Sequence, residues 1–550
     1  MPEEIKQNKE EEITSPIHEE AVPKDLPSDD NLVEMISKWE VESKPYNDEL
    51  RKEQDFCEQY YLGNQTMRNY VPQFLSNHVT NRIFEAIETA VPIITAKSPE
   101  FIALPAQEDE ESALLADKTQ KVLSELFDKL DIKEKLETVV RHFLLFRFGV
   151  LKPFWNEIKK NIDVRYVRPQ LIYIPRYGQS VDELPYILED QSYTYQDLVD
   201  NFGAEKALSL LVTTSEGKPG EPKKLYQVWE ASTDHWTVWK CGNNILKKDK
   251  NLYYNFEDES ENYFEFPKKP YVFLATFPYA KGMVSSPSIA YQGIPLQDAI
   301  NTITRKIIDH AVKMGNGAWM IDSEVMTFEE AKEKINNAAG IIIHGKGAAR
   351  QDMVRRDAPV PLPNYFIVLL AQLNSHFDNL FGLHSTTRGE RGSQETATGR
   401  QLLKQADLGR LDAFVRITER AIDDLGEWLL QLMKLFYDTE HVFPILGEDG
   451  SAEFIKFKKE SIQKGMKVKV RHGSTLPTDP EVEANRVIQL WQLGAIDPIT
   501  LYKKLNYSNP EALAQKLMLF KTGQLFPQPQ PQVAAGVPPQ AGGGGQVITP

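Results

Sequence analysis

Apolar residues recur at intervals of three and four positions over much of the first 150 residues, a spacing typical of amphipathic helices. The pattern predicts helices over Asp48–Tyr61, Asn81–Thr95, Ser112–Leu130 and Asp131–Phe148. Short β-branched and aromatic runs then predict strands at Val150–Trp155, Ile162–Val167, Leu171–Ile174, Leu225–Ser232, His235–Lys240 and Tyr271–Phe277. Helices followed by strands in blocks indicate an α+β fold.

A helical pattern returns after Pro287 and continues to Met314, and the run Gly315-Asn316-Gly317 ends it. One face of this helix carries Ile300, Ile303, Ile307, Ala311 and Met314. A small module of about fifty residues follows. It is predicted to hold a strand at Ala318–Asp322, a helix at Thr327–Asn337 and a strand at Gly340–His344. A second apolar helix is expected over Tyr365–Phe381.

A long polar loop, Gly382–Leu403, separates this second helix from a helical pattern over Arg400–Tyr437. A loop of such length within a folded body is usually either functional or disordered. Gly409 and Gly426 lie inside the long helical pattern and predict a kink or close packing there. Strands at Glu453–Phe457 and Met466–Val470 follow, and then helices over Glu481–Leu493, Thr500–Lys504 and Pro510–Phe520.

Composition and charge narrow the class of protein. The 41% hydrophobic and 26% charged residues are those of an ordinary folded protein, and two cysteines cannot form a disulfide framework. The sequence shows no signal peptide and no run long enough to span a membrane, so we expect a soluble protein made inside the cell. Residues 1–30, rich in carboxylates, and 526–550, rich in Pro, Gln and Gly, are expected to be disordered.

The net charge of -16 argues against tight, general binding of nucleic acid, because such binding requires basic groups that neutralise phosphates. It does not exclude a protein that surrounds DNA without gripping it. An acidic wall would repel the duplex and let it slide.

No catalytic constellation emerges from the sequence, and we expect no catalytic residue, cofactor or bound metal. The run HGKGAAR (344–350) lacks the spacing of a phosphate-binding loop. The carboxylates of Glu257, Asp258, Glu259 and Glu261 could ligate a cation, but a charge run of this kind is more often a solvated turn.

The order of these elements resembles the portal proteins of tailed double-stranded DNA bacteriophages. The resemblance is carried by six stretches: YLGNQ (61–65), NRIFEAIETAVPIITAKSPEFIALPA (81–106), PLQDAINTITRKIIDHAVKM (295–314), GAWMIDSEVMTFEEAKEKINNAAGIIIHG (317–345), NYFIVLLAQLNSHFDNLFGL (364–383) and GSQETATGRQLLKQADLGRLDAFVR (392–416). Each stretch alone is weakly specific, and their combined order is more so.

The resemblance implies a ring-forming portal-type fold. Its parts would be an α+β wing (31–286), a first stem helix (287–314), an α/β clip (315–363) and a second stem helix (364–382). A tunnel loop (383–399), a long kinked helix with wing-closing strands (400–480) and a helical crown (481–525) would follow.

The same resemblance implies a non-enzymatic dodecameric ring at the capsid portal vertex of the virion, made in the host bacterial cytoplasm. DNA would pass through the channel during packaging and ejection, and terminase, head–tail adaptor or tail proteins, the major capsid protein and scaffolding proteins would be partners. The tunnel loop would touch DNA through Thr386, Thr387, Arg388, Glu390, Arg391, Ser393, Gln394, Glu395 and Thr396. Arg350, Arg355 and Arg356 would form the clip's partner interface or, equally well on sequence grounds, a solvated basic edge.

Two other functions stay open. The polar loop could be the mobile lid of a nucleic-acid-processing enzyme, although such an enzyme needs an acid or metal cluster that the sequence does not display. Alternatively, the chain could be a scaffold or adaptor that binds protein through its tails. The loop itself could also be a simple hinge, with glycines that relax the chain between the helices.

Overall fold

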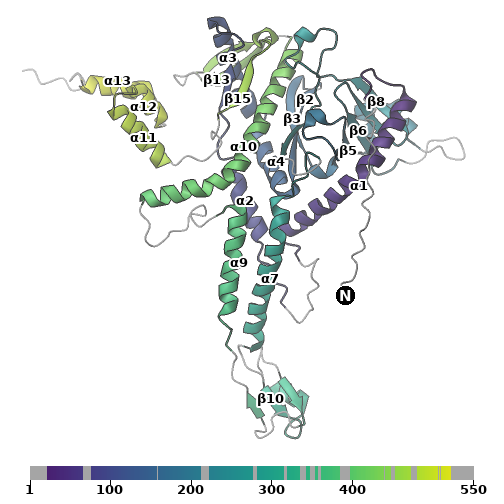
Figure 1. The fold of residues 1–550 in the computed structure, drawn as a ribbon, viewed down its shortest axis with the longest axis vertical. Coiled ribbons are helices and arrows are strands. Elements are labelled where there is room, and N and C mark those ends of the chain that lie inside the picture. The colour runs from purple at the N-terminus through teal and green to yellow at the C-terminus, as the bar shows by residue number, and fades with distance from the viewer. Residues whose placement is uncertain are drawn as a thin grey trace, which may run out of the picture. The chain divides into compact units, whose positions relative to one another are not determined.

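The computed structural model describes residues 22–65, 76–157, 159–211, 222–276, 282–314, 319–334, 342–346, 354–356, 361–383, 397–438, 440–446, 452–471, 480–505, 507 and 509–521. The chain forms two units, one from residues 1–445 with 454–477 and the other from 446–453 with 478–550. Helices and sheets are mixed, so the α+β expectation is confirmed (Figure 1).

Four helices and one strand come first: α1 (Asp29–Tyr61), α2 (Arg82–Ile94), β1 (Phe101–Leu104), α3 (Glu110–Lys129) and α4 (Ile132–Phe146). The longest of them, α1, starts well before the predicted helix at Asp48. Its early apolar residues Leu32, Ile36 and Trp39 are buried against strands of a five-stranded sheet, which explains why the helix extends so far.

Residues 22–30 differ from the expected disordered arm, because part of this stretch packs against the same sheet. Val22 and Leu26 lie against the apolar cluster that contains Trp236. The indole nitrogen of Trp236 also donates a hydrogen bond to the backbone oxygen of Pro23 at 3.0 Å. The prediction that the arm reaches residue 30 was therefore wrong for the last residues of that range, while residues 1–21 lie outside the described part of the chain.

Two antiparallel sheets form the middle of the first unit. The smaller has the order β3-β2-β9, and the larger the order β4-β5-β6-β7-β8. Their strands are β2 (Phe148–Asn156), β3 (Asn161–Val167), β4 (Ile172–Tyr173), β5 (Ile187–Tyr193), β6 (Tyr226–Ser232), β7 (Trp236–Cys241), β8 (Asn244–Lys250) and β9 (Val272–Ala275). Helices α5 (Tyr195–Phe202) and α6 (Ala204–Ser209) connect β5 to β6 in the sequence. The sequence analysis did not predict β5, β8 or these two helices.

A buried group of charged side chains joins the two sheets. Lys152 on β2 donates hydrogen bonds to Glu189 on β5 at 2.8 Å, to Glu230 on β6 at 2.5 Å and to the Tyr271 hydroxyl at 2.9 Å. Burial alone would raise the pKa of Glu189, but the charges of Lys152 and Arg165 hold it well below its ordinary value. Glu189 is therefore held ionised by the two cations beside it, and its hydrogen bond with Lys152 links β5 of the larger sheet to β2 of the smaller one.

Helix α10 (Ala397–Phe436) changes direction along its length, and its second half passes through the body of the first unit (Figure 1). It is packed against α2, the β3-β2-β9 sheet and the two-stranded sheet of β1 with β15 (Lys467–Val470), and the side chains of its second half are largely buried. A methyl group on Gly426 would lie only 3.2 Å from Val468 and 3.4 Å from Phe101. The prediction of close packing is confirmed at this glycine.

Further elements complete the two units. Strands β13 (His441–Leu446) and β14 (Ala452–Phe457) pair with each other. The second unit contains α11 (Pro480–Gln492), α12 (Pro498–Lys504) and α13 (Pro510–Lys521), close to the three helices predicted there. The Asp497 side chain accepts hydrogen bonds from the backbone of Ile499 and Thr500, and thereby caps α12. No helix in the described ranges combines the length and apolarity needed to cross a bilayer.

Candidate functional site: a helix pair and the module between its halves

Helices α7 (Ile289–Met314) and α9 (Tyr365–Phe381) flank a small module in the sequence and lie side by side in the fold (Figure 1). At one end of the pair Phe377 and Phe381 of α9 stack with ring centroids 4.7 Å apart and face Gly293 of α7. A methyl group at Gly293 would approach the Phe381 ring to 2.9 Å. The missing side chain thus allows the two helices to approach closely at this point.

A row of polar side chains on α7 holds the chain segment 76–83 against the helix. The row consists of Gln297, Asn301, Arg305 and Asp309, four residues apart and therefore on one face. Its contacts to the segment's backbone are the Gln297 amide with Arg82 N at 2.9 Å and Thr80 O at 2.6 Å, Asn301 with Thr80 N at 3.0 Å, Arg305 with His78 O at 2.9 Å, and Asp309 with Ser76 N at 2.8 Å. Segment 76–83 therefore follows α7 for about three turns, given the spacing of this row.

Arg82 connects this segment to α9 as well. Its guanidinium forms an ion pair with Asp378 of α9 at 2.5 Å and lies over the ring of Phe377 at 5.6 Å. A second ion pair joins it to Glu85 of α2 at 2.6 Å. Arg82 is the first residue of α2, and its backbone nitrogen also contacts Gln297 of α7, so this one residue joins α2 to both α7 and α9.

The sequence analysis missed the polar row and Arg82 because it followed apolar positions only. The sequence does contain a sign of this row, because four polar residues recur at intervals of four on a helix that was predicted from its apolar face alone. Their partners lie 217 positions away in the case of Gln297 and Thr80, so sequence spacing could not identify what the row binds.

Helix α9 leaves most of its apolar side chains uncovered at its first half. Tyr365, Ile367 and Val368 are 62%, 57% and 56% exposed, and Leu369 is also exposed. In the whole helix only Phe377 and Phe381 are buried. Contiguous apolar surface of this kind marks a site of association with another molecule.

The described part of the module between the two helices forms a three-stranded sheet with one helix. Its order is β11-β10-β12, with β10 (Trp319–Asp322) parallel to β11 (Ile342–Gly345) and antiparallel to β12 (Val354–Arg356). Helix α8 (Phe328–Lys334) contributes the buried Ala331, and β10 contributes the buried Ile321. Phe328 and Ile343 are 47% and 44% exposed. Among the described residues of the module, few apolar side chains are therefore covered.

The predicted contact residues fall largely outside the described part of the chain. This holds for Arg350 and for the loop residues Thr386, Thr387, Arg388, Glu390, Arg391, Ser393, Gln394, Glu395 and Thr396. Arg355 and Arg356 are placed on β12, where their backbone pairs with Met320 and Trp319 of β10. The predicted DNA contacts and partner interface stay predictions.

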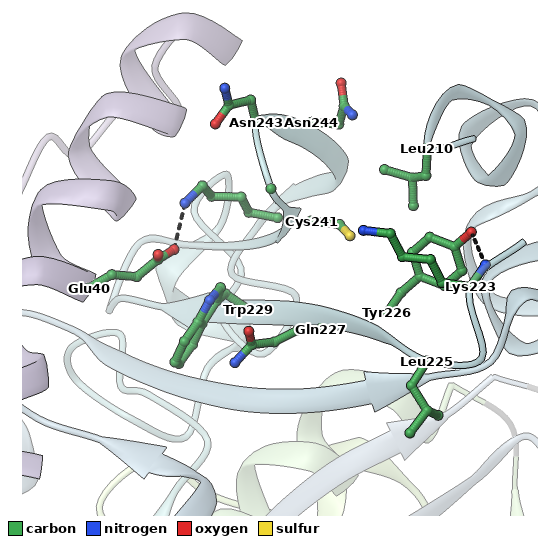
Figure 2. A pocket seen from close by; sticks show the side chains of 12 residues that line it. Glu40, Leu210, Lys223, Leu225, Tyr226, Gln227, Trp229, Cys241, Asn243 and Asn244 are labelled. Atoms are coloured by element: carbon green, nitrogen blue, oxygen red, sulfur yellow. Dashed lines mark hydrogen bonds and ion pairs between the residues drawn. The ribbon is translucent and has the colours of Figure 1, made fainter. Parts of the chain in front are cut away.

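The described residues contain no group of three or more His, Cys, Asp or Glu side chains arranged to hold a metal ion. A hollow of about 550 Å³ opens beside β6 and β7 (Figure 2). There Lys240 is neutralised by Glu40 at 2.5 Å, and burial raises the pKa of the Cys241 thiol, which keeps it protonated. These two groups cannot supply an activated nucleophile.

The sequence of the second part of the chain matches a known family. A family model described as "Phage P22-like portal protein" matches residues 235–542, which is more than half of the 550 residues. The matched range includes the helix pair, the module between its halves, the long helix and the three C-terminal helices. No curated protein matches the chain.

Proposed function

This chain belongs to the P22-like phage portal protein family, and from that premise we propose that it assembles into a ring at one vertex of the capsid. Members of this family are structural proteins of the virion that connect head and tail. In our proposal twelve copies form the ring, and the phage genome enters and leaves through its central channel. The chain itself performs no chemistry, and terminase supplies the energy for packaging.

The uncovered first half of α9 is the observation that supports ring assembly most directly. Tyr365, Ile367 and Val368 each leave more than half of their surface in water, although fully burying such side chains contributes about 1.5–3 kcal/mol each. A helix this apolar needs a covering surface, and in a ring each neighbour supplies one by repeating the same contact.

The remaining roles are assigned by element order. The pair α7 and α9 serves as the stem, residues 315–363 as the clip, residues 481–525 as the crown, and residues 31–286 with 400–480 as the wing and its closing elements. Arg350, Arg355 and Arg356 of the clip dock terminase and later the head–tail adaptor or tail proteins. The capsid and scaffolding proteins meet the outer surface of the ring.

The tunnel loop was expected over residues 383–399, but α10 already begins at Ala397, so in this proposal the residues before that helix touch DNA transiently. The loop's threonines, Ser393 and Gln394 offer small polar contacts, Arg388 and Arg391 meet phosphates, and Glu390 and Glu395 limit the attraction. Deleting residues 386–396 should leave rings intact while DNA packaging or retention falls. If ring assembly fails instead, the loop is a structural element.

Electron microscopy of the purified chain tests ring assembly. The wild-type chain should give rings with a central hole, and the double variant I367D/V368D should give single subunits, because association would bury two carboxylates without partners. Val41 of α1 is 73% exposed and provides the matched control, so V41D should still form rings. A wild-type chain that stays a compact monomer would contradict the proposal and favour an enzyme or an adaptor.

A further inference from the structure

One short run of this acidic chain is strongly basic. Residues 456–471 hold seven cationic residues and a single carboxylate, Glu460, whereas the whole chain has a net charge of -16. We call these seven residues the basic strip: Lys456, Lys458, Lys459, Lys464, Lys467, Lys469 and Arg471. Such a reversal of charge within one run indicates a surface for an anionic partner.

The fold directs most of these side chains outward. On β15, Val468 is buried while Lys467 and Lys469 on either side of it are exposed. On β14 and just after it, Phe457 is buried while Lys456 and Lys458 are exposed. Alternate residues of a strand lie about 6.6 Å apart on one face, so each strand presents a short row of cations to solvent.

Three members of the basic strip have no ion pair with any described residue. The other four are paired: Lys456 with Glu440 at 2.8 Å, Lys459 with Asp438 at 3.1 Å and Glu261 at 3.3 Å, Lys469 with Asp423 at 3.4 Å, and Arg471 with Glu100 at 2.9 Å. The three without such a pair are Lys458, Lys464 and Lys467, and all three are exposed. The hydrogen bond from Lys456 is the main cause that lowers the pKa of the Glu440 carboxyl, and Lys458 lies near enough to help, whereas Lys464 and Lys467 have no ion pair with a described residue. A polyanion that contacts such exposed lysines displaces the mobile ions around them.

The strip is extended along α10 rather than concentrated at one point. At one end the backbone nitrogen of Val470 donates to Asp423 of α10 at 2.5 Å. At the other, the ammonium of Lys434 on α10 donates to the backbone oxygen of Ile462 at 2.8 Å. Residues 423 and 434 are about 16 Å apart along a helix. An extended anion with regularly spaced charges fits this layout better than a single phosphate does.

We propose that the basic strip binds the phosphate backbone of duplex DNA, independently of sequence, at a place separate from residues 383–399. The choice of DNA as the polyanion rests on the proposed portal function. The residue types in the strip also favour DNA over a protein, because six of the seven cationic residues are lysines and protein–protein interfaces are depleted in lysine. The exposed Ile102 and Leu104 on β1 pair with Lys469 and Lys467, and they are the feature that an acidic protein partner would use instead.

Fluorescence anisotropy with a labelled 30-base-pair duplex, at salt concentrations from 25 to 150 mM, tests the proposal on the full chain. The variant K458Q/K464Q/K467Q should bind more weakly, and its slope of log affinity against log salt should be less negative by about 2.7, which is about 0.9 for each lost phosphate contact. The control K44Q/K52Q/K516Q removes three exposed lysines elsewhere and changes the net charge equally. It should keep the wild-type slope.

Equal slopes for the two triple variants would overturn the proposal, because the effect would then come from net charge alone. Displacement of the DNA by poly-glutamate at equal charge concentration would overturn it in favour of an acidic protein partner. Ring assembly of each variant, measured in parallel by electron microscopy, keeps the two claims apart. Rings without strip-dependent DNA binding refute this inference only, and the absence of rings refutes the proposed function.

Discussion

The second half of α10 and the first half of α9 are both rich in apolar residues, but their surroundings differ. In α10, Leu425, Leu429 and Met433 are fully buried by elements of the same chain. In α9, Tyr365, Ile367 and Val368 are more than half exposed. The core of a single subunit therefore accounts for the apolar residues of α10. The apolar residues in the first half of α9 are not covered by the same subunit, and we infer that another molecule covers them.

Substitution to alanine in each helix tests this contrast and gives the largest expected effect. Leu429→Ala should lower the free energy of unfolding by about 2–5 kcal/mol, because it leaves a cavity in the core of the subunit. Ile367→Ala should change the stability of the isolated subunit by less than about 0.5 kcal/mol and weaken ring assembly. Urea denaturation measures the first quantity and the fraction of rings measures the second. A large loss of subunit stability in I367A would show that α9 belongs to the core.

Acid distinguishes the covered core from the exposed helix face. Burial lowers the pKa of His142 on α4 to about 4, with the charges of Arg168 and Arg141 as smaller causes. Because this pKa lies below the unfolded value of about 6.5, stability is full above pH 6.5 and falls as the pH drops toward 4. The loss amounts to roughly 3 kcal/mol at most.

The measurement is the melting temperature between pH 7 and pH 4 for the wild-type chain and His142→Gln. The variant should show a smaller decline above pH 5 than the wild-type chain. A remaining decline is expected from His235 and His441, because burial lowers the pKa of both side chains. An equally steep decline in H142Q would assign the pH dependence to other groups. The apolar positions at the start of α9 contain no ionisable side chain except Tyr365, so acid does not act on that face directly.

Two glycines compare the packing of the helices directly. A methyl group at Gly293 of α7 would lie 2.9 Å from Phe381 and 3.5 Å from Phe377, a stacked pair that cannot easily shift. Gly293→Ala should therefore cost about 1–3 kcal/mol of stability. Both substitutions gain about 1 kcal/mol of helix propensity, but Gly426→Ala in α10 meets its nearest neighbour only at 3.2 Å, so we expect a smaller loss of stability there. Thermal unfolding of both variants measures the two losses of stability. A larger loss in Gly426→Ala than in Gly293→Ala would contradict this description of the helix pair.

The smallest effect concerns the link between the two long helices. Asp378→Asn removes the charge that holds Arg82 to α9 and should cost about 1 kcal/mol, since one charge-assisted hydrogen bond becomes neutral. Glu85→Gln, which alters the more exposed partner of the same arginine, is the matched control and should cost less. If both variants lose the same free energy of unfolding, the ion pair of Arg82 with α9 stabilises the protein no more than its exposed pair with Glu85 does.

Much of this fold could be predicted because local signals agreed with the final packing. Helix α9 occupies the predicted residues Tyr365–Phe381, since Pro363 precedes it and Gly382 ends it in a left-handed conformation. Strand β5 was missed because it turns Glu189 and Gln191 toward the buried charged group, which removes the apolar alternation of an ordinary strand. Strand β8 is the edge of its sheet and rich in lysine, so its sequence shows little apolar patterning.

The candidate site could be predicted only in outline. Apolar spacing located the helix pair and the module between its halves. The polar row on α7 depends on a segment more than 200 positions away, and neither spacing nor composition reveals such a partner. The sequence alone shows the basic strip as seven cationic residues among sixteen. Only the structure shows which of them form ion pairs and that three have none among the described residues.

The mass of the purified full-length chain in solution is the most direct test of the account, because its central claim is that other copies cover the first half of α9. Mass photometry at decreasing protein concentration should show a species of about twelve times the 62.8 kDa of one chain, and that species should be lost in I367D/V368D but kept in V41D. A wild-type chain that remains at 62.8 kDa at all concentrations would contradict the claim.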